Sequence, residues 1–165
     1  MPQVRLTTNH GALVLDLDEA AAPRTVGNFL GYVDAGHYEG SVFHRVIPGF
    51  MIQGGGFTAD LRQKPVGPPV PNEADNGLRN LRYAVAMART SDPHSATAQF
   101  FVNTVDNPAL DHSAPTPAGW GYAVFGSVVE GRGTVDAIAG VATGRAGGHA
   151  DVPKEAVVIE RAERL

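Results

Sequence analysis

The chain has 165 residues, of which 43% are hydrophobic and 18% are charged, and its formal net charge is −4. This length and composition predict one folded domain over residues 1–165 and argue against a disordered chain. The negative charge and the lack of a basic cluster argue against nucleic-acid binding. Without cysteine the chain can form no disulfide or thiolate site, and no apolar run is long enough to span a bilayer.

The first elements predicted along the chain are a hairpin and a helix. Residues 4–8 and 12–17 alternate apolar and polar side chains on either side of a turn at 9–11, which predicts a β-hairpin. Residues 22–36 change to helical spacing, with one apolar face made of Val26, Phe29, Leu30 and Val33. Pro23 suits the first turn of this helix, Asp18 and Glu19 favour its positive end, and Gly36 suits its C-terminal stop. We expect the helix to be packing material without a catalytic residue.

The stretch 43–56 is an apolar run that polar side chains interrupt. Residues 42–47 are predicted to form a strand, Pro48 and Gly49 a turn, and residues 50–53 a returning strand. Alternation places Phe43, Arg45 and Ile47 on one face of the first strand and His44 and Val46 on the other.

An arginine in such a strand has two interpretations. It can be a structural ion pair at the end of a core strand, or it can belong to a functional site, because its charge and its donors need partners. The return of Phe50, Met51 and Gln53 beside Arg45 favours the functional site.

The rest of the chain is predicted to consist of short strands between long loops. The loop 57–80 is rich in Pro, Gly and Asn, and the small polar residues of 88–98 suit either a flexible loop or the low wall of a groove for an extended ligand. Many strands with two separate helices predict a closed or nearly closed antiparallel β-barrel with helical plugs. The remaining predicted elements are strands at 83–87, 99–103, 122–125 and 156–159, a short helix at 134–139, and loops at 106–121 and 140–152.

Several kinds of chemistry lack their sequence signatures. The six histidines have no metal-ligand spacing, so we expect no metal site, and His10, His37, His94, His112 and His149 are predicted to be turn or surface-loop residues. Gly54–Gly56 is not followed by Lys-Ser or Lys-Thr, which disfavours a nucleotide site. No nucleophile elbow or paired carboxylate accompanies Arg45. We therefore expect a reaction without a cofactor and without a covalent bond to the protein.

Three separated motifs make the chain resemble the cyclophilins, a family of peptidyl-prolyl cis-trans isomerases. Residues 43–55 read Phe-His-Arg-Val-Ile-Pro-Gly-Phe-Met-Ile-Gln-Gly-Gly, and residues 96–103 read Ala-Thr-Ala-Gln-Phe-Phe-Val-Asn. Residues 119–126, Gly-Trp-Gly-Tyr-Ala-Val-Phe-Gly, resemble the bacterial branch of the family, as do residues 140–145 and 151–153. The resemblance extends over essentially the whole chain. It implies a closed eight-stranded antiparallel β-barrel capped by two α-helices, with the active site on the outer face.

The resemblance also implies a role for individual residues. Arg45 would be the catalytic residue, and an apolar pocket for the proline ring would be formed by Phe50, Met51, Phe101 and Leu110. Gln53 would hydrogen-bond the substrate backbone, with Gln99 helping to hold the site. The groove before the proline and the rim of the pocket would be formed by His44, Ala88, Arg89 and Tyr122.

The chemistry of the reaction suits these residues independently of the resemblance. Isomerisation twists a C–N bond with partial double-bond character over a barrier of about 18–20 kcal/mol. Twisting restores a lone pair to the prolyl nitrogen, so a fixed donor aimed at that nitrogen binds the twisted state better than the planar one. Arginine suits this role because it donates without losing its proton.

The expected partners are proline-containing peptides and unfolded or flexible chains, and we expect a cytoplasmic monomer that binds neither nucleic acid nor membranes. Ala109 stands where many eukaryotic members have a tryptophan that contacts cyclosporin, so the resemblance implies at most weak cyclosporin binding. Arg89 replaces an asparagine common in those members, which can change the preference for the residue before proline.

Two other functions remain as alternatives at this stage. The first is a peptide-binding module with the same groove and no turnover, because a fold alone does not prove activity. The second is a β-barrel carrier of small apolar ligands, which predicts a hollow interior, whereas the bulky side chains of these strands favour a filled one.

Overall fold

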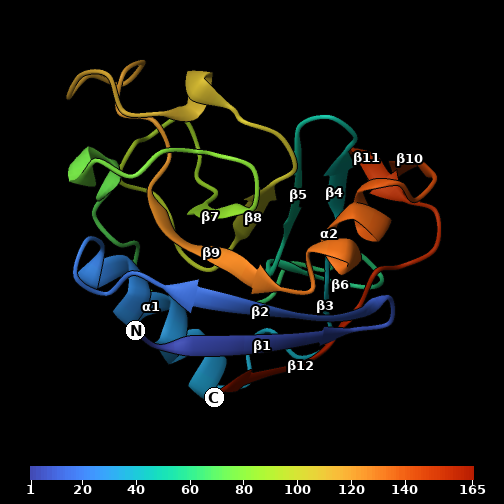
Figure 1. Cartoon of the computed structure of the whole chain (residues 1–165). Helices are drawn as coiled ribbons and strands as arrows, with labels where there is room; N and C mark the ends of the chain where they lie inside the picture. The colour runs from blue at the N-terminus through green and yellow to red at the C-terminus, as the bar shows by residue number, and fades with distance from the viewer.

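The computed structural model describes residues 1–165 and contains a strongly curled antiparallel sheet of eight strands (Figure 1). The strand order is β12-β1-β2-β9-β7-β8-β5-β4, so the last and first strands of the chain pair at one end of the sheet and the consecutive strands β4 and β5 pair at the other. No helix in the structure combines the length and the apolar character needed to cross a membrane. The strands are β1 (Gln3–Thr8), β2 (Gly11–Leu17), β4 (Arg45–Ile47), β5 (Met51–Gly54), β7 (Ala84–Met87), β8 (Phe100–Asn103), β9 (Val124–Glu130) and β12 (Ile159–Arg164).

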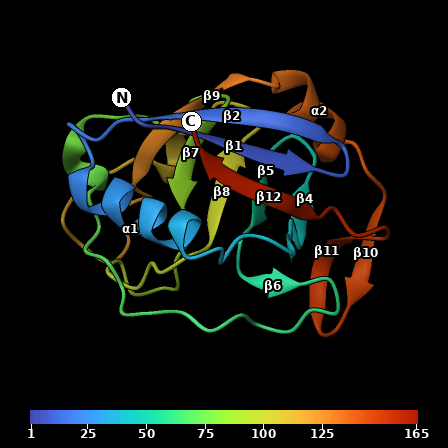
Figure 2. The ribbon, with the colours of Figure 1, turned by 90° about the horizontal axis from the view of Figure 1, so that it is seen from below.

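Two helices lie at opposite ends of the curled sheet (Figures 1 and 2). Helix α1 (Pro23–Asp34) packs against β12, and α2 (Arg132–Ala139) packs against β2, β4 and β5. Two small sheets complete the fold: β3 (Ser41–Val42) pairs with β6 (Phe57–Thr58), and β10 (Thr143–Ala146) pairs with β11 (His149–Pro153). The structure therefore confirms a mainly-β fold with two helices.

The space between the sheet and the helices is filled. A core of 28 buried residues occupies it. At its centre the Phe29 ring lies 5.1 Å from the rings of Tyr38 and Phe125 and 5.5 Å from that of Phe100, measured between centroids. A packed interior of this kind leaves no room for a ligand, which argues against the carrier alternative.

The prediction of a closed eight-stranded barrel is not confirmed. The sheet is open, because its edge strands β4 and β12 do not pair with each other. The chain before β4 lies in the gap: Phe43 N–H donates to the Val157 carbonyl at 2.9 Å, and Gly40 N–H donates to the Ile159 carbonyl at 2.8 Å. The curl is thus completed by the short segment that contains β3, without a continuous ladder of strands.

The N-terminal hairpin and first helix match their predictions. Leu13, Leu15 and Leu17 on β2 are fully buried, as alternation requires. The helix has Pro23 at its first turn, and Gly36 has a φ of +73° just beyond its end. Its N-terminus is not satisfied by the acidic residues expected there, since Glu73 from the long loop accepts from Thr25 N–H at 2.7 Å.

Several other predicted boundaries are wrong. The predicted strand 42–47 is broken at 43–44, so Phe43 and Val46 both enter the main core, although alternation had placed them on opposite faces. The strand predicted at 122–125 is β9 at 124–130, and the predicted loop 140–152 contains the β10–β11 hairpin. Its sequence, rich in glycine and polar residues, has no alternation that would reveal strands. The closing strand predicted at 156–159 is β12 at 159–164. The prediction missed its range because β12 is an edge strand, and its charged residues conceal the alternation of buried and exposed side chains.

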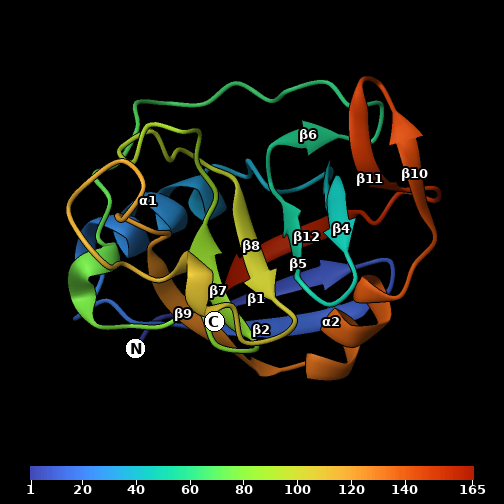
Figure 3. The ribbon, with the colours of Figure 1, turned by 90° about the horizontal axis from the view of Figure 1, so that it is seen from above.

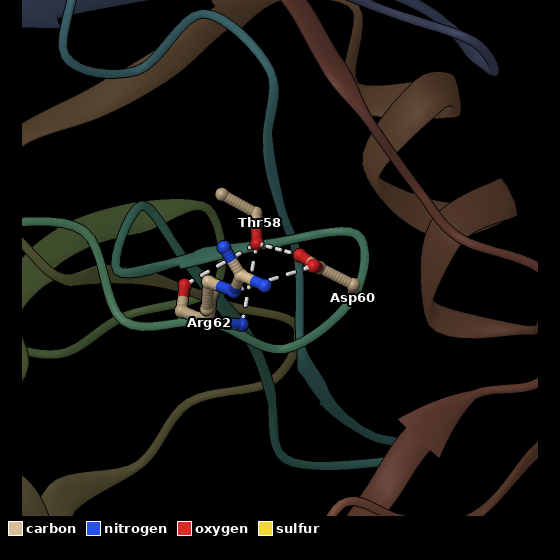
Figure 4. Close-up of polar contacts among 3 residues, drawn as sticks. All are labelled: Thr58, Asp60 and Arg62. Carbon is tan, nitrogen blue, oxygen red and sulfur yellow. Dashed lines mark hydrogen bonds and ion pairs between the residues drawn. The ribbon is translucent and has the colours of Figure 1, made fainter.

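The long loop after β5 has an ordered turn directly after β6 (Figure 4). Thr58 is its centre: the hydroxyl bonds to Asp60, Thr58 N–H donates to the Arg62 carbonyl at 2.9 Å, and Arg62 N–H donates to the Thr58 hydroxyl at 3.2 Å. The hydrogen bond from Thr58 is the main cause that lowers the pKa of Asp60 below its ordinary value. The turn thus directs the chain back across the protein surface, as expected for an ordered loop.

The turn before α2 provides a test of the fold. Gly131 has a φ of +79°, and a Cβ there would collide with the carbonyl oxygen of Ala12. We expect Gly131→Ala to lower the free energy of unfolding by more than about 1 kcal/mol, measured by urea denaturation. Gly133→Ala is the matched control, because a Cβ at that helical position meets nothing within 4 Å. It should leave stability unchanged or raise it by up to about 1 kcal/mol, and equal losses in both variants would contradict the argument.

Candidate active site

The candidate site lies on the outer face of the strands β4, β5, β8 and β7, which run side by side in the sheet (Figure 3). The register pairs Arg45 with Gln53, Gln53 with Phe101, and Phe101 with Ala86. Directly paired residues of neighbouring strands point to the same face, so these four side chains form one row across the sheet. Their sequence neighbours Val46, Ile52, Phe100 and Val85 point inward into the core.

The row borders a cavity of about 130 Å³. A small buried cluster beneath it contains Met51 and Phe101, packed with Ala84, Ala86, Ala88 and Val124. The structure brings nine of the eleven predicted site residues to this cavity, which is lined by Arg45, Phe50, Met51, Gln53, Ala88, Arg89, Phe101, Leu110 and Tyr122. Gln99 lines an adjoining cavity, and His44 lines neither.

Arg45 is exposed at the edge of the cavity and forms no ion pair, so the structural ion-pair interpretation of this residue is wrong. Its Nη1 donates to Gln53 Oε1 at 3.3 Å, and Gln53 Nε2 donates to Gln99 Oε1 at 3.0 Å. This chain of side-chain hydrogen bonds holds the guanidinium over the apolar cavity while most of its donors stay free.

Arg89 forms a second cationic wall of the cavity. Its Nε donates to the Gly121 carbonyl at 3.0 Å and its Nη1 to the Thr90 carbonyl at 2.8 Å. The guanidinium carbon lies 4.4 Å from the centre of the Tyr122 ring, a cation–π arrangement. These contacts fix both the arginine and the aromatic ring that closes the cavity.

Three asparagines that the sequence analysis missed hold the backbone of the cavity walls. The Asn107 side-chain amide donates to the Phe50 carbonyl at 3.0 Å and to Asn103 Oδ1 at 2.8 Å. Asn103 in turn donates to Asn80 Oδ1 at 3.0 Å, and the Asn80 amide donates to the Leu110 carbonyl at 3.1 Å. Asn103 falls within the motif 96–103, which was the one available signal, whereas Asn80 and Asn107 looked like ordinary loop residues.

His44 directly precedes Arg45, and its buried ring packs in an aromatic cluster with the half-buried Phe57 and His149. Its ring centroid is 4.5 Å from that of Phe57 and 5.9 Å from that of His149, and its buried Nδ1 has no hydrogen-bond partner. Burial is the main cause that lowers the pKa of His44 to about 4, and repulsion from His149 and Arg45 adds to it. At neutral pH the ring is therefore uncharged, and its contacts are with this cluster.

The prediction that the other histidines are turn or surface-loop residues is only partly right. His10 is exposed in its turn, and His94 is exposed in its loop. His37 is half-buried and bonds to the Gly55 carbonyl at 2.9 Å, and His112 bonds to the Trp120 carbonyl at 3.0 Å. His149 belongs to β11 of the unpredicted β10–β11 hairpin, and its ring lies against that of His44.

Comparison with known proteins decides the family. Residues 3–164 match the family model described as cyclophilin type peptidyl-prolyl cis-trans isomerase. The chain belongs to this family. The resemblance of its motifs to the cyclophilins is thereby confirmed, and so is the activity they predicted: this cyclophilin is a peptidyl-prolyl cis-trans isomerase.

Relatives cover this cyclophilin from end to end. It is 62% identical to peptidyl-prolyl cis-trans isomerase cyp18 of Streptomyces antibioticus, with 100% of this chain and 99% of that protein aligned. It is 57% identical to peptidyl-prolyl cis-trans isomerase B of Escherichia coli, over 95% of this chain and 96% of that protein, which confirms the resemblance to the bacterial branch.

A solved structure of the same family confirms the architecture. It is a cyclophilin type isomerase of Cryptosporidium parvum, crystallised in the presence of the dipeptide Ala-Pro. The TM-score is 0.79 at 25% sequence identity, and the match covers 97% of this chain and 96% of that one. The curled sheet and its two helices are therefore those of a cyclophilin.

The asparagine network gives the first prediction for this site. Asn80→Ala removes one of the two donors to the Leu110 carbonyl, which keeps Tyr122 N–H at 2.9 Å, and it also removes an acceptor of the Asn103 amide. We expect a loss of about 1–3 kcal/mol in the free energy of unfolding. Because Leu110 lines the cavity, KM in an X-Pro isomerisation assay should rise more than kcat falls. The control is Asn9→Ala, which removes an amide that holds the Ala156 backbone away from the cavity and should leave KM unchanged. A similar KM in wild type and Asn80→Ala would contradict a positioning role.

The buried His44 gives a second prediction, for the dependence of stability on pH. The pKa of His44 is about 4 in the folded protein and 6.5 when unperturbed. As the pH falls, His44 is therefore protonated near pH 6.5 in the unfolded chain but only near pH 4 in the folded protein. Between these values the free energy of unfolding should fall, by up to roughly 3 kcal/mol from this group.

The measurement is urea unfolding of wild type and His44→Phe at pH 7 and pH 5. The variant keeps an aromatic ring of similar size against Phe57 but cannot bind the proton. The loss of stability between the two pH values should be smaller in the variant. An equal or larger loss would show that His44 does not carry this dependence.

Proposed function

We propose that this isomerase acts through the cavity on the outer face, with Arg45 as the catalytic residue. The observation that carries the proposal is an exposed guanidinium, without a carboxylate partner, held by Gln53 at the edge of an apolar cavity. A bound X-Pro bond would place its prolyl nitrogen at this edge. Arg45 then donates to the nitrogen as the bond twists and the lone pair returns.

The apolar part of the cavity is proposed to hold the proline ring. Its walls are Phe50, Met51, Phe101, Leu110 and Tyr122, and a volume of about 130 Å³ suits a small ring. Support comes from the Cryptosporidium parvum relative, whose structure was determined with Ala-Pro. We therefore propose proline-containing peptides as substrates.

The polar residues beside the cavity are proposed to hold the substrate backbone. Gln53 reaches the cavity with its amide, and Gln99 fixes that amide from behind. No hydrogen bond within the protein uses the backbone N–H or C=O of Arg89, so both groups can pair with a peptide that lies along Ala88 and Arg89. His44 contributes through its packing behind Arg45, since its ring is buried.

The mechanism needs no covalent intermediate and no cofactor. The planar X-Pro bond resists twisting by about 18–20 kcal/mol because resonance is lost. Holding the ring and the preceding backbone separately lets the protein bind the twisted geometry, and an apolar surrounding strengthens the hydrogen bond to nitrogen.

In the cell we propose that the whole chain works as a single domain and a monomer in the cytoplasm. Its clients are unfolded or flexible chains whose X-Pro bonds limit folding, because uncatalysed isomerisation takes tens to hundreds of seconds, about the slowest step of many folding reactions. Ala109 offers only a methyl group on its exposed turn, which supports weak cyclosporin binding.

The test is the cis-to-trans rate of an X-Pro peptide with wild type, Arg45→Ala and Arg45→Lys. Loss of a donor that acts on the transition state should lower kcat/KM by on the order of 10²-fold in Arg45→Ala. The lysine variant should recover part of the rate, because it keeps a charged donor of different geometry.

Arg79→Ala is the matched control, since Arg79 is exposed, forms no ion pair and lies outside this cavity. It should retain the wild-type rate. Unchanged activity in a folded Arg45→Ala protein would remove Arg45 from the mechanism. An inactive wild type that still binds the peptide would favour the peptide-binding module.

A further inference from the structure

Two arginines border the same cavity, and neither has a carboxylate partner. Arg45 and Arg89 both line it, and none of the ion pairs in the protein includes either residue. The protein as a whole carries a net charge of −4. The cavity is therefore a local cationic site on an acidic protein.

We propose that Arg89 selects substrates with an acidic side chain on the N-terminal side of the proline. The proposal rests on the proposed binding of the proline ring in the apolar cavity. It adds a specificity determinant to the isomerase: Glu or Asp, one or two residues before the proline, pairs with the Arg89 guanidinium.

Arg89 is pre-organised for such a pair. Its Nε and Nη1 donate to the carbonyls of Gly121 and Thr90, and its plane is held over Tyr122. An arginine has five N–H donors, so about three remain for a ligand. Because the side chain is already fixed, little further conformational entropy is lost when a carboxylate binds.

A second cavity provides the space for the acidic side chain. It has a volume of about 170 Å³ and adjoins the first through Gln53, Ala88 and Arg89. Arg89 is its only charged lining residue, and the others are Gln53, Gln63, Ala88, Thr90, Ser95, Thr97 and Gln99. A carboxylate there meets one cation and neutral hydrogen-bond donors.

The nearest acidic residue in this loop does not neutralise Arg89. Asp92 accepts from His94 N–H at 2.9 Å within its own turn and forms no ion pair. A lysine in the substrate would face Arg89 without compensation. The site thus favours acidic, tolerates neutral and disfavours basic residues before the proline.

The experiment compares isomerisation of matched peptides with Glu, Gln or Lys at each of the two positions before the proline. At low ionic strength we expect kcat/KM for Glu to exceed that for Gln by roughly two- to fivefold at one position, with Lys lowest, as for a half-exposed ion pair. The advantage should shrink at high salt. Arg89→Gln should bring the Glu-to-Gln ratio close to one, and Arg89→Lys should retain part of it.

Arg79→Gln is the control with the same change in net charge, and it should keep the wild-type ratio. The same peptides are titrated by NMR, which measures their affinity whether or not they are turned over. The proposal would be overturned if wild type had equal kcat/KM values for the Glu and Gln peptides at both positions. It would also be overturned if the Glu-to-Gln ratio of kcat/KM were unchanged in Arg89→Gln. Failure of the proposed proline site is a distinct outcome, in which no proline peptide binds at the cavity.

Discussion

The filled interior is the constraint on which the rest of the structure depends. Because large side chains occupy the space between the sheet and both helices, a substrate can be bound only on the outside. Alternation along a strand then gives one element both a core-facing and a cavity-facing side chain: in β8, Phe100 points into the core and Phe101 toward the cavity. The strand β5 does the same with Ile52 and Met51. The core thereby fixes the positions of Phe101 and Met51 through their immediate sequence neighbours.

Alternation also explains which parts of the fold could be predicted from the sequence. The hairpin β1–β2 and helix α1 have clear apolar periods and were correct, whereas the β10–β11 hairpin has almost no buried face and was missed. Phe43 points into the core and Arg45 away from it, although strict alternation had placed both on one face. The cause is the break in the strand at 43–44, which shifts the alternation by one residue and which residue types do not reveal. The prediction of a closed sheet failed for a different reason: closure depends on whether the edge strands β4 and β12 pair with each other, which the pattern of single strands does not show.

Site prediction had a similar division. Most residues that line the cavity lie in continuous motifs, whereas Ala88, Arg89 and Leu110 lie outside them. Cross-strand register brings Arg45, Gln53 and Phe101 into one row. The asparagines that hold its walls act through side-chain bonds to backbone carbonyls far along the chain, such as Asn107 to Phe50. Residue type alone gives no sign of such a partner. The family resemblance named the groups facing the cavity, and only the structure identified what supports them.

Arg45 belongs to β4, a strand of three residues at the edge of the sheet, paired on one side only with β5. Its other side is covered by the β10–β11 hairpin, which packs there without joining the ladder (Figure 3). Such an element opens locally at a lower free energy than the central strands. Amide hydrogens of β4 should consequently exchange before those of β8. Because the proposed mechanism depends on Arg45, warming should lower the isomerase activity while the core is still folded.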